Sequence, residues 1–215
     1  MPVALSLPIL TQLAPNARSS YREAAATAQP VLDRHGITQN KLRLAHFLAQ
    51  ILHESGALTL QVENMNYSAP RLPVVWPSRF QPKGPLDPAA FANNPEKLGN
   101  EVYGKRMGNT QPGDGFRYRG RGLMQLTGRD SYREATRFVR GFTPDAPDFE
   151  AEPDLVFSAA WALPIAAAEW DAKGCNPLAD ADQITQVTQR INGGQIGIAD
   201  RRDWLLRVKS LLGGP

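Results

Sequence analysis

Cysteine and histidine are scarce in this chain of 215 residues, which contains one cysteine and three histidines. The lone cysteine, Cys175, cannot form an intramolecular disulfide, so we expect a semi-buried small residue and no disulfide framework. Three histidines and one cysteine spread through the sequence do not make the ligand set of a protein metal site. We therefore expect neither a bound metal nor a cofactor.

Long hydrophobic runs are also missing. No apolar run approaches the roughly 18 residues that a membrane-spanning helix needs, so we expect no membrane insertion. The N-terminus lacks a basic region and has prolines at positions 2 and 8, unlike a secretory signal. Ser6 before Pro8 is instead typical of a helix cap and first turn. We expect a protein made in the cytoplasm without a signal peptide, for which any action outside requires another release route.

What the chain does have is a hydrophobic content of 42%, enough to bury a core without an oligomer, so we expect a monomer. Helical signals dominate, and a proline-rich stretch at 68–95 predicts short helical turns and loops. Apolar and polar residues alternate from Leu123 to Thr127, which indicates one short strand. The economical picture is a single helical domain with two lobes. The predicted helices are 16–35 with a kink or break at Pro30, 40–55, 129–140, 153–173, 182–192 and 198–212.

The helix at 40–55 has the clearest periodicity. Its apolar face carries Leu44, Leu48 and Ile51, and Glu54 lies at the border of that face, nearly two turns below Phe47. A carboxyl in this place is partly desolvated, which favours a protonated group able to donate to a leaving glycosidic oxygen. The opposite stripe, about 100° away, holds the polar residues His46, Gln50 and His53, so we expect His53 to have a structural partner of its own.

A second glutamate, Glu63, follows nine residues later in a polar stretch beyond Gly56. A polar environment favours the ionised form of the Glu63 carboxyl, and a base that activates water must be ionised. Taken singly, a glutamate at a helix end is more often a solvated surface charge than a catalyst. Two carboxyls in unlike environments are nevertheless what hydrolysis of a sugar–sugar bond requires.

The glycine-rich segment 108–128 contains a second group of polar side chains. If 123–127 is a strand, Gln125 and Thr127 point to one side, where an amide and a hydroxyl could hold a water or a sugar. Thr127 could equally be the N-cap of the helix at 129–140. Gly120 and Gly122 begin like a dinucleotide fingerprint, but Gln125 replaces its third glycine, so we expect no phosphate cradle.

The net charge of +3 is unevenly distributed. Residues 105–140 contain nine Lys/Arg against three Asp/Glu, a local net charge of +6. Such a band suits a polyanion, either nucleic acid or an anionic cell-wall polymer, although many such bands are only solvated faces. Because no nucleic-acid-reading module is recognisable, we expect no nucleic-acid partner.

Four ordered motifs carry a resemblance to glycoside hydrolase family 19, the plant-type chitinase family, and especially to its compact branch of phage and prophage endolysins. The resemblance extends over about residues 40–210, with N-terminal helices at about 1–36 preceding that catalytic core. It leaves no room for a separate wall-binding module, so we expect a single catalytic domain at 1–215. The matching strings are FLAQILHESG at 47–56, VENMNYS at 62–68, YRGRGLMQLTG at 118–128 and INGG at 191–194.

The resemblance implies a mainly α, bilobal, lysozyme-like fold with the substrate in a cleft near the short strand or hairpin. By matching position, Glu54 is the general acid and Glu63 the general base of an inverting mechanism. Thr127 matches a residue that helps to hold the attacking water. Gln125 and Asn192 match positions whose side chains contact sugar, and Arg201 matches the arginine that interacts with the catalytic carboxylates. Asn66 and Tyr67 are weaker candidates for sugar contacts. Arg202 is an alternative to Arg201 if the register differs by one residue.

The departures from the plant enzymes favour the bacterial and phage branch. The disulfides of the plant enzymes are absent, and Glu-Ser-Gly at 54–56 replaces their Glu-Thr-Thr type of sequence at the acid. The resemblance therefore implies a peptidoglycan hydrolase that cuts between N-acetylmuramic acid and N-acetylglucosamine, reaching the cell wall after release, for example through a holin pore. A chitinase acting on β-1,4 N-acetylglucosamine polymers is the alternative. The second alternative is a non-catalytic glycan-binding protein with the same fold.

Overall fold

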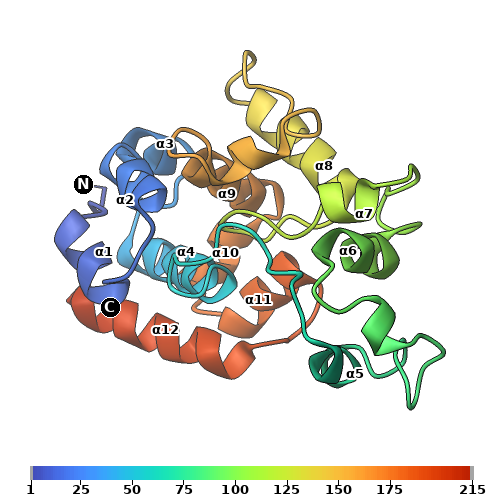
Figure 1. Cartoon of the computed structure of the whole chain (residues 1–215). Coiled ribbons are helices and arrows are strands. Elements are labelled where there is room, and N and C mark those ends of the chain that lie inside the picture. Colours follow the sequence, from blue (N-terminus) through green and yellow to red (C-terminus); the bar gives the residue numbers. More distant parts are fainter. Residues whose placement is uncertain (1, 214–215) are drawn as a thin grey trace. The chain divides into compact units, whose positions relative to one another are not determined.

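The computed structural model describes residues 2–213, and within them helices are the dominant secondary structure (Figure 1). The chain forms two compact units. Unit 1 comprises the described residues of Met1–Gln61 and Arg133–Pro215 together with Arg121–Gln125, and unit 2 comprises Val62–Gly120 and Leu126–Tyr132. The predicted mainly α fold is confirmed, whereas a single catalytic domain over 1–215 stays a prediction.

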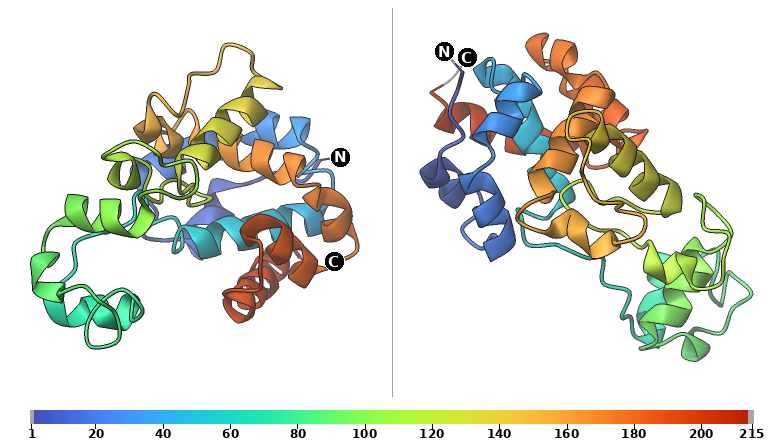
Figure 2. Two further views of the ribbon diagram at one scale, coloured as in Figure 1. Left: turned by 90° about the vertical axis from the view of Figure 1, so that its right-hand side faces the viewer. Right: turned by 90° about the horizontal axis from the view of Figure 1, so that it is seen from above.

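Unit 1 contains the two longest helices, α4 and α12, which pack against each other (Figure 1 and Figure 2). The predicted start at Ser6 is confirmed, since its hydroxyl accepts a hydrogen bond from the Ile9 amide over 3.4 Å. The break near Pro30 is confirmed too, because one helix ends before it and the next begins there. The helices of unit 1 are α1 (Leu7–Leu13), α2 (Ser19–Ala26), α3 (Gln29–Arg34), α4 (Lys41–Glu54), α9 (Ala162–Ala172), α10 (Cys175–Asp180), α11 (Ile184–Asn192) and α12 (Ile198–Leu211), with a 3-10 helix at Pro153–Phe157.

Helix α4 lies at the centre of the packing of unit 1. It begins at the N-cap Asn40, whose side chain accepts from the Arg43 amide over 2.9 Å. Every residue from Leu44 to Leu52 is buried, so His46 and Gln50 of the polar stripe are buried as well as the apolar face, while His53 is half-buried. The expected partner of His53 is present, because its Nδ1 lies 2.6 Å from the Asp200 carboxylate of α12.

Unit 2 is built from short elements, as its prolines predict. Its hydrophobic core consists of Met65, Leu72, Phe80, Phe91, Leu98 and Val102. An isolated β-bridge joins Phe80 to Leu86. The elements of unit 2 are 3-10 helices at Ala69–Arg71 and Pro88–Ala90, α5 (Leu72–Val75), α6 (Pro95–Tyr103) and α7 (Asp114–Arg117), while α8 (Arg129–Arg140) begins in unit 2 and continues in unit 1.

The structure corrects the prediction of a strand at 123–127. Residues 122–125 form turns between single bridge residues at 121 and 126. Gly122 and Gln125 both have positive φ, at 74° and 50°, which is incompatible with an extended alternation of side chains. Gln125 and Thr127 therefore do not share one face of a strand.

Smaller differences concern helix boundaries. The predicted helix at 153–173 is two elements, because residues 158–161 interrupt it. Helices α6, α7 and α10 were not predicted. No helix within the described part of the chain combines the length and the apolar character needed to cross a membrane.

Candidate active site

Glu54 is the last residue of α4, and the packing of that helix fixes where its carboxyl emerges. The Ser55 hydroxyl donates to the Ile51 carbonyl over 2.5 Å and accepts from the Leu58 amide over 2.9 Å, which closes the helix end. Ser55 is thus structural. The Glu54 side chain is 16% exposed, so the carboxyl stands at the edge of a buried scaffold.

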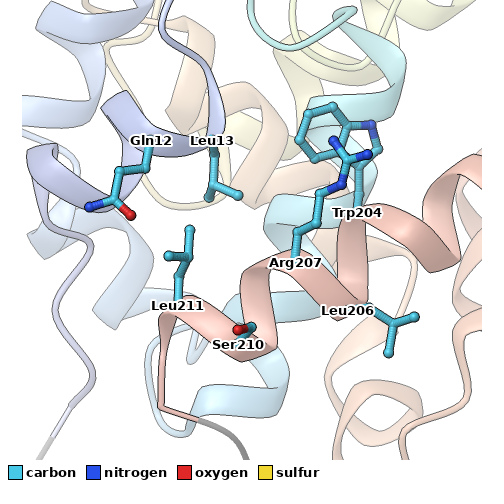
Figure 3. A pocket seen from close by; sticks show the side chains of 7 residues that line it. All are labelled: Gln12, Leu13, Trp204, Leu206, Arg207, Ser210 and Leu211. Carbon is cyan, nitrogen blue, oxygen red and sulfur yellow. The ribbon is translucent and has the colours of Figure 1, made fainter.

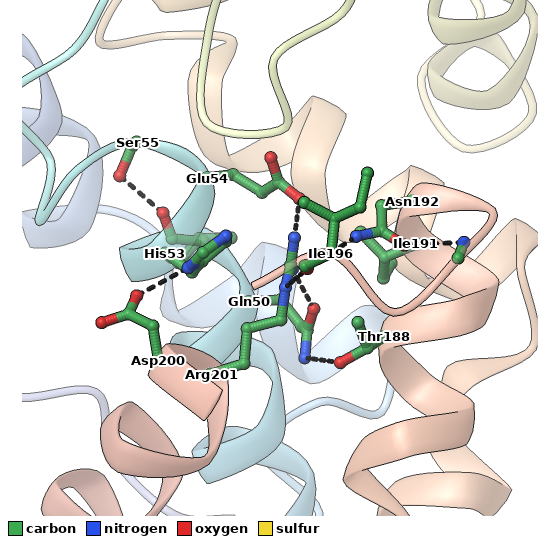
Figure 4. Close-up of polar contacts among 12 residues, drawn as sticks. Gln50, His53, Glu54, Ser55, Thr188, Ile191, Asn192, Ile196, Asp200 and Arg201 are labelled. Atoms are coloured by element: carbon green, nitrogen blue, oxygen red, sulfur yellow. Dashed lines mark hydrogen bonds and ion pairs between the residues drawn. The ribbon is translucent and has the colours of Figure 1, made fainter. Parts of the chain in front are cut away.

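A buried guanidinium holds Glu54 (Figure 4). Arg201, in the first turn of α12, is 1% exposed and donates to both the Glu54 carboxylate and the Gln50 side-chain oxygen. Its Nε also donates to the Ile196 carbonyl over 3.3 Å. Gln50 in turn donates to the Thr188 hydroxyl over 3.3 Å. This buried charge is therefore compensated by one carboxylate and two neutral oxygens, as burial requires.

The choice between the two adjacent arginines follows from the same contacts. Arg202 is exposed and donates to the Thr185 hydroxyl over 3.1 Å. Only Arg201 of this pair reaches Glu54, so the register with Arg201 is the one that the geometry favours. Gln50 is a member of this group that sequence reasoning placed only in a structural stripe. Its position four residues before Glu54 on α4 was the available signal.

In unit 2, Glu63 is held by a tyrosine and a backbone amide. The Tyr103 hydroxyl donates to its two carboxylate oxygens over 2.8 Å and 3.0 Å, and the Gly120 amide approaches within 3.3 Å. Burial raises the pKa of Tyr103, and the Glu63 charge raises it further. The phenol therefore stays protonated and remains a donor.

Tyr103 was missed by sequence reasoning, because α6 was not predicted. The available signal was Asn94 before Pro95, an N-cap followed by proline at the first helical position. The structure confirms this cap, since the Asn94 side chain accepts from the Lys97 amide over 3.0 Å. Tyr103 is the last residue of the helix that starts there.

The two weaker sugar-contact candidates also lie in unit 2. Asn66 is exposed, and its amide donates to the Asn64 side chain over 2.8 Å. The Tyr67 ring packs edge-on against Trp76, with ring centroids 5.1 Å apart. Burial raises the pKa of Tyr67, and the charge of Glu63 adds to it. Unit 2 thus gathers Tyr67 and Tyr103 around Glu63.

Gln125 and Thr127 take part in the turns of their own segment. The Gln125 side chain donates to the Gly122 carbonyl over 3.1 Å, so its amide is engaged within the turn. The Thr127 side chain is half-buried, and its carbonyl accepts from the Ser131 hydroxyl in the first turn of α8.

Asn192 ends α11 and organises the loop that follows. Its side-chain nitrogen donates to the Ile196 carbonyl over 3.1 Å, and its oxygen accepts from the Gly194 amide over 2.8 Å. Arg201 donates to the same Ile196 carbonyl. Unit 1 therefore brings Asn192, Arg201 and Glu54 into one hydrogen-bonded group (Figure 4).

Other polar clusters of the described residues have structural partners rather than the arrangement of a site. His35 and His46 pair with Asp171 and Asp182 over 3.2 Å and 2.8 Å, like His53 with Asp200. Within residues 2–213, no group of three His, Cys, Asp or Glu side chains is placed to hold a metal ion. Cys175 is fully buried rather than semi-buried, and burial raises its pKa to about 12.

A cavity of about 530 Å³ lies between α1 and α12 (Figure 3). It contains none of the predicted site residues, and leucines make up much of its wall. The residues that line it are Gln12, Leu13, Trp204, Leu206, Arg207, Ser210 and Leu211.

The chain is mainly helical and has two partly buried glutamates, each held by hydrogen-bond donors, and a pair of carboxyls is what acid–base hydrolysis of a glycosidic bond requires. Comparison with curated proteins identifies the family. The chain is 38% identical over 166 residues to a glycosyl hydrolase family 19 domain-containing protein of Haemophilus influenzae, a match that covers 75% of this chain and 76% of that protein. The chain therefore belongs to glycosyl hydrolase family 19, and it is a glycoside hydrolase.

Solved structures show the same fold. Chitinase C from Streptomyces griseus matches with a TM-score of 0.68 at 17% identity, covering 99% of this chain and 94% of the other. A bacterial family 19 chitinase matches with a TM-score of 0.62 at 21% identity, covering 99% and 96%. These similarities confirm the predicted lysozyme-like helical fold. No family model matches the sequence.

Proposed function

We propose that this protein is a peptidoglycan hydrolase of the endolysin type, which cleaves the β-1,4 bond between N-acetylmuramic acid and N-acetylglucosamine. The observation that carries the proposal of a working catalytic centre is the buried Arg201 held on Glu54. Burying a guanidinium group costs desolvation free energy, which an arginine exposed to water does not incur. In a chain of this family, such a pair is best explained by a carboxyl whose position matters for the reaction.

In the proposed mechanism, Glu54 protonates the leaving glycosidic oxygen while Glu63 takes a proton from the attacking water. The bond to the anomeric carbon breaks as the water oxygen attacks from the opposite face, so the configuration inverts. Glu54 ends deprotonated and Glu63 protonated, and exchange with solvent restores both. We assign the holding of water to Thr127, as the family position implies.

Tyr103 supports the role of Glu63 as base. The single phenol proton is shared between the two carboxylate oxygens, which lie 2.8 Å and 3.0 Å from the Tyr103 hydroxyl, and a hydrogen bond to a charged acceptor is stronger than a neutral one. Tyr103 acts on the base rather than on the sugar. The proposed sugar contacts are Asn66, Tyr67, Gln125 and Asn192.

Charge supports peptidoglycan over chitin as the substrate. Muramic acid and its peptide carry carboxylates, whereas chitin is a neutral polymer. In unit 2 the exposed cations of the basic band include Lys105, Arg106 and Arg117. An anionic glycan is attracted to such a surface, and salt weakens that attraction. We expect lysis to slow as ionic strength rises, and a flat salt dependence would count against this reading.

The test is digestion of purified peptidoglycan and of soluble chitin oligomers, followed by mass spectrometry of the fragments. We expect peptidoglycan fragments that end in reducing N-acetylmuramic acid. Fresh products examined by NMR should show the inverted anomer. Glu54→Gln should lower turnover by at least about 100-fold, because the amide cannot donate the proton. Glu23→Gln, an exposed change on α2, is the control and should leave turnover unchanged.

The alternative is a chitinase, which the similarity to bacterial chitinases favours. Cleavage of chitin oligomers with peptidoglycan left intact would establish it. Full lysis by the Glu54→Gln variant would refute the assignment of Glu54 as the general acid. Binding to glycan without cleavage by the wild type would establish the non-catalytic alternative.

The working form that we propose is a monomer acting on the cell wall. Sedimentation analysis tests the first part. Lysis from without, using bacteria with permeabilised outer membranes, tests whether the wall is the target once access is provided.

A further inference from the structure

Lys173 links the end of α9 to the end of α11 within unit 1. Its Nζ lies 2.7 Å from the Ile191 carbonyl, in the last turn of α11. Carbonyls in the last turn of a helix have no partner within the helix, and a cation there is favourable. Lys173 therefore anchors α11 at the residue immediately before Asn192.

A buried carboxylate holds Lys173 in this place. Glu169, one turn earlier on α9, approaches the Lys173 ammonium to 2.7 Å and is 12% exposed. Its second oxygen is buried without a hydrogen-bond partner among the described residues. Burial raises the pKa of Glu169 against the opposing effect of Lys173, and the Glu54 charge adds to the rise. A carboxylate with one unsatisfied oxygen is costly to bury, which indicates a specific purpose for its contact with Lys173.

From Lys173 a continuous series of contacts leads to Glu54. Ile191 precedes Asn192, and Asn192 donates to the Ile196 carbonyl over 3.1 Å. The same carbonyl accepts from Arg201 over 3.3 Å. Arg201 holds Glu54, as Figure 4 shows. Each contact lies within unit 1. Ile191 and Arg201 are buried and Lys173 and Glu54 are half-buried, whereas Asn192 and Ile196 are exposed.

We propose that Lys173 is a positioning residue for the reaction, which fixes the loop 192–197 and through the Ile196 carbonyl orients Arg201 on Glu54. Glu169 holds the ammonium at the Ile191 carbonyl. Neither residue touches the substrate. This inference rests on the proposed function, because it assigns a purpose to the geometry of Glu54.

The test compares Lys173→Met with Lys209→Met. Lys209 is a second half-buried lysine of unit 1, paired with Asp182 over 2.5 Å and outside the loop contacts. Lys173→Met should lower kcat/KM by about tenfold or more, the equivalent of one hydrogen bond to a charged group, with both a lower kcat and a higher KM. Lys173→Arg should restore most of this activity. Lys209→Met should lower thermal stability and leave kcat and KM unchanged.

Hydrogen exchange gives a readout that does not depend on activity. The Gly194 amide, which donates to Asn192, should exchange faster in Lys173→Met and at the wild-type rate in Lys209→Met. If Lys173→Met does not fold, Glu169→Gln tests the same idea, with a smaller acceleration at Gly194 and a smaller loss of kcat/KM.

The outcomes separate the two proposals. If the wild type cleaves no glycan while Lys173→Met still accelerates exchange at Gly194, the proposed function is refuted and the role of Lys173 in fixing the loop is kept. Unchanged exchange and unchanged kcat/KM in Lys173→Met would overturn the inference, as would equal losses of activity in Lys173→Met and Lys209→Met.

Discussion

Replacing Arg201 with methionine removes the cation from a site that has been built around it. The change leaves the Glu54 carboxylate without its ion pair and removes the donor to the Gln50 side-chain oxygen, which is fully buried. Methionine fills much of the space of the arginine stem, so the loss concerns polar contacts more than packing. Arg201→Met therefore isolates the polar contribution of this residue.

The expected magnitude follows from burial. Removing one partner of a buried ion pair costs about 3–5 kcal/mol. The Glu54 side chain keeps 16% of its exposure and can recruit water, which places the expected loss near the lower end, at about 3 kcal/mol. For a chain of this length, each kcal/mol corresponds to about 2–4 °C in Tm, so we expect Tm to fall by about 6–12 °C. Activity below that temperature should fall by at least about tenfold, because Glu54 loses its orientation.

Arg202→Met is the matched control, since the adjacent arginine is exposed and donates only to Thr185 among the contacts identified for it. Its change in the free energy of unfolding should stay within about 0.5 kcal/mol. Urea unfolding followed by circular dichroism measures both variants. Equal destabilisation by the two substitutions, or a stable Arg201→Met protein with full activity, would refute the reasoning from burial.

Other changes have equally definite outcomes. Glu63→Gln should be severely impaired in turnover, and Thr127→Ala less so, when glycan release is followed at a fixed pH. Tyr103→Phe should lower kcat by about tenfold with little change in secondary structure, since it removes a hydrogen bond to a charged acceptor, and an unchanged kcat would remove Tyr103 from the site. Burial lowers the pKa of His46, so the folded protein favours the neutral ring. Below about pH 6.5 the histidine of the unfolded chain binds a proton that the folded protein resists, so the free energy of unfolding falls as the pH is lowered through that range. Urea unfolding at pH 7.5 and pH 5 should show this loss, and His46→Gln should show a smaller one; identical pH dependence in both proteins would contradict this account.

The sequence predicted the helices best where local signals agreed. The helix at 40–55 has a capping Asn40, an apolar period and a terminal glycine, and the structure has α4 at Lys41–Glu54. The helix at 129–140 was predicted with the boundaries that α8 has. The strand at 123–127 was wrong because alternation of apolar and polar residues in a glycine-rich segment does not distinguish a strand from successive turns. A positive φ at Gln125, a residue that rarely adopts it, has no signature in the sequence.

The candidate site was predictable by residue type and motif but not by contact. Nothing local in the sequence pairs Glu63 with Tyr103, forty residues away, or chooses Arg201 over Arg202 for Glu54. These pairings depend on how elements distant in sequence pack, which period and propensity do not specify. The same limit explains why the basic band at 105–140 could be recognised as a charge pattern and not as a surface.

The polar stripe of α4 explains how unit 1 sets the position of Arg201. His46, Gln50 and His53 lie along one side of a helix that is buried from Leu44 to Leu52, and buried polar groups require partners. The segment preceding α11 supplies Asp182 to the first, and α12 supplies Arg201 and Asp200 to the others. A slip of α12 by one turn along α4 would take Arg201 away from Gln50 and Asp200 away from His53, at a cost of several kcal/mol. The stripe thus fixes the register of the two helices, and that register is what places the Arg201 guanidinium on Glu54, one turn beyond Gln50.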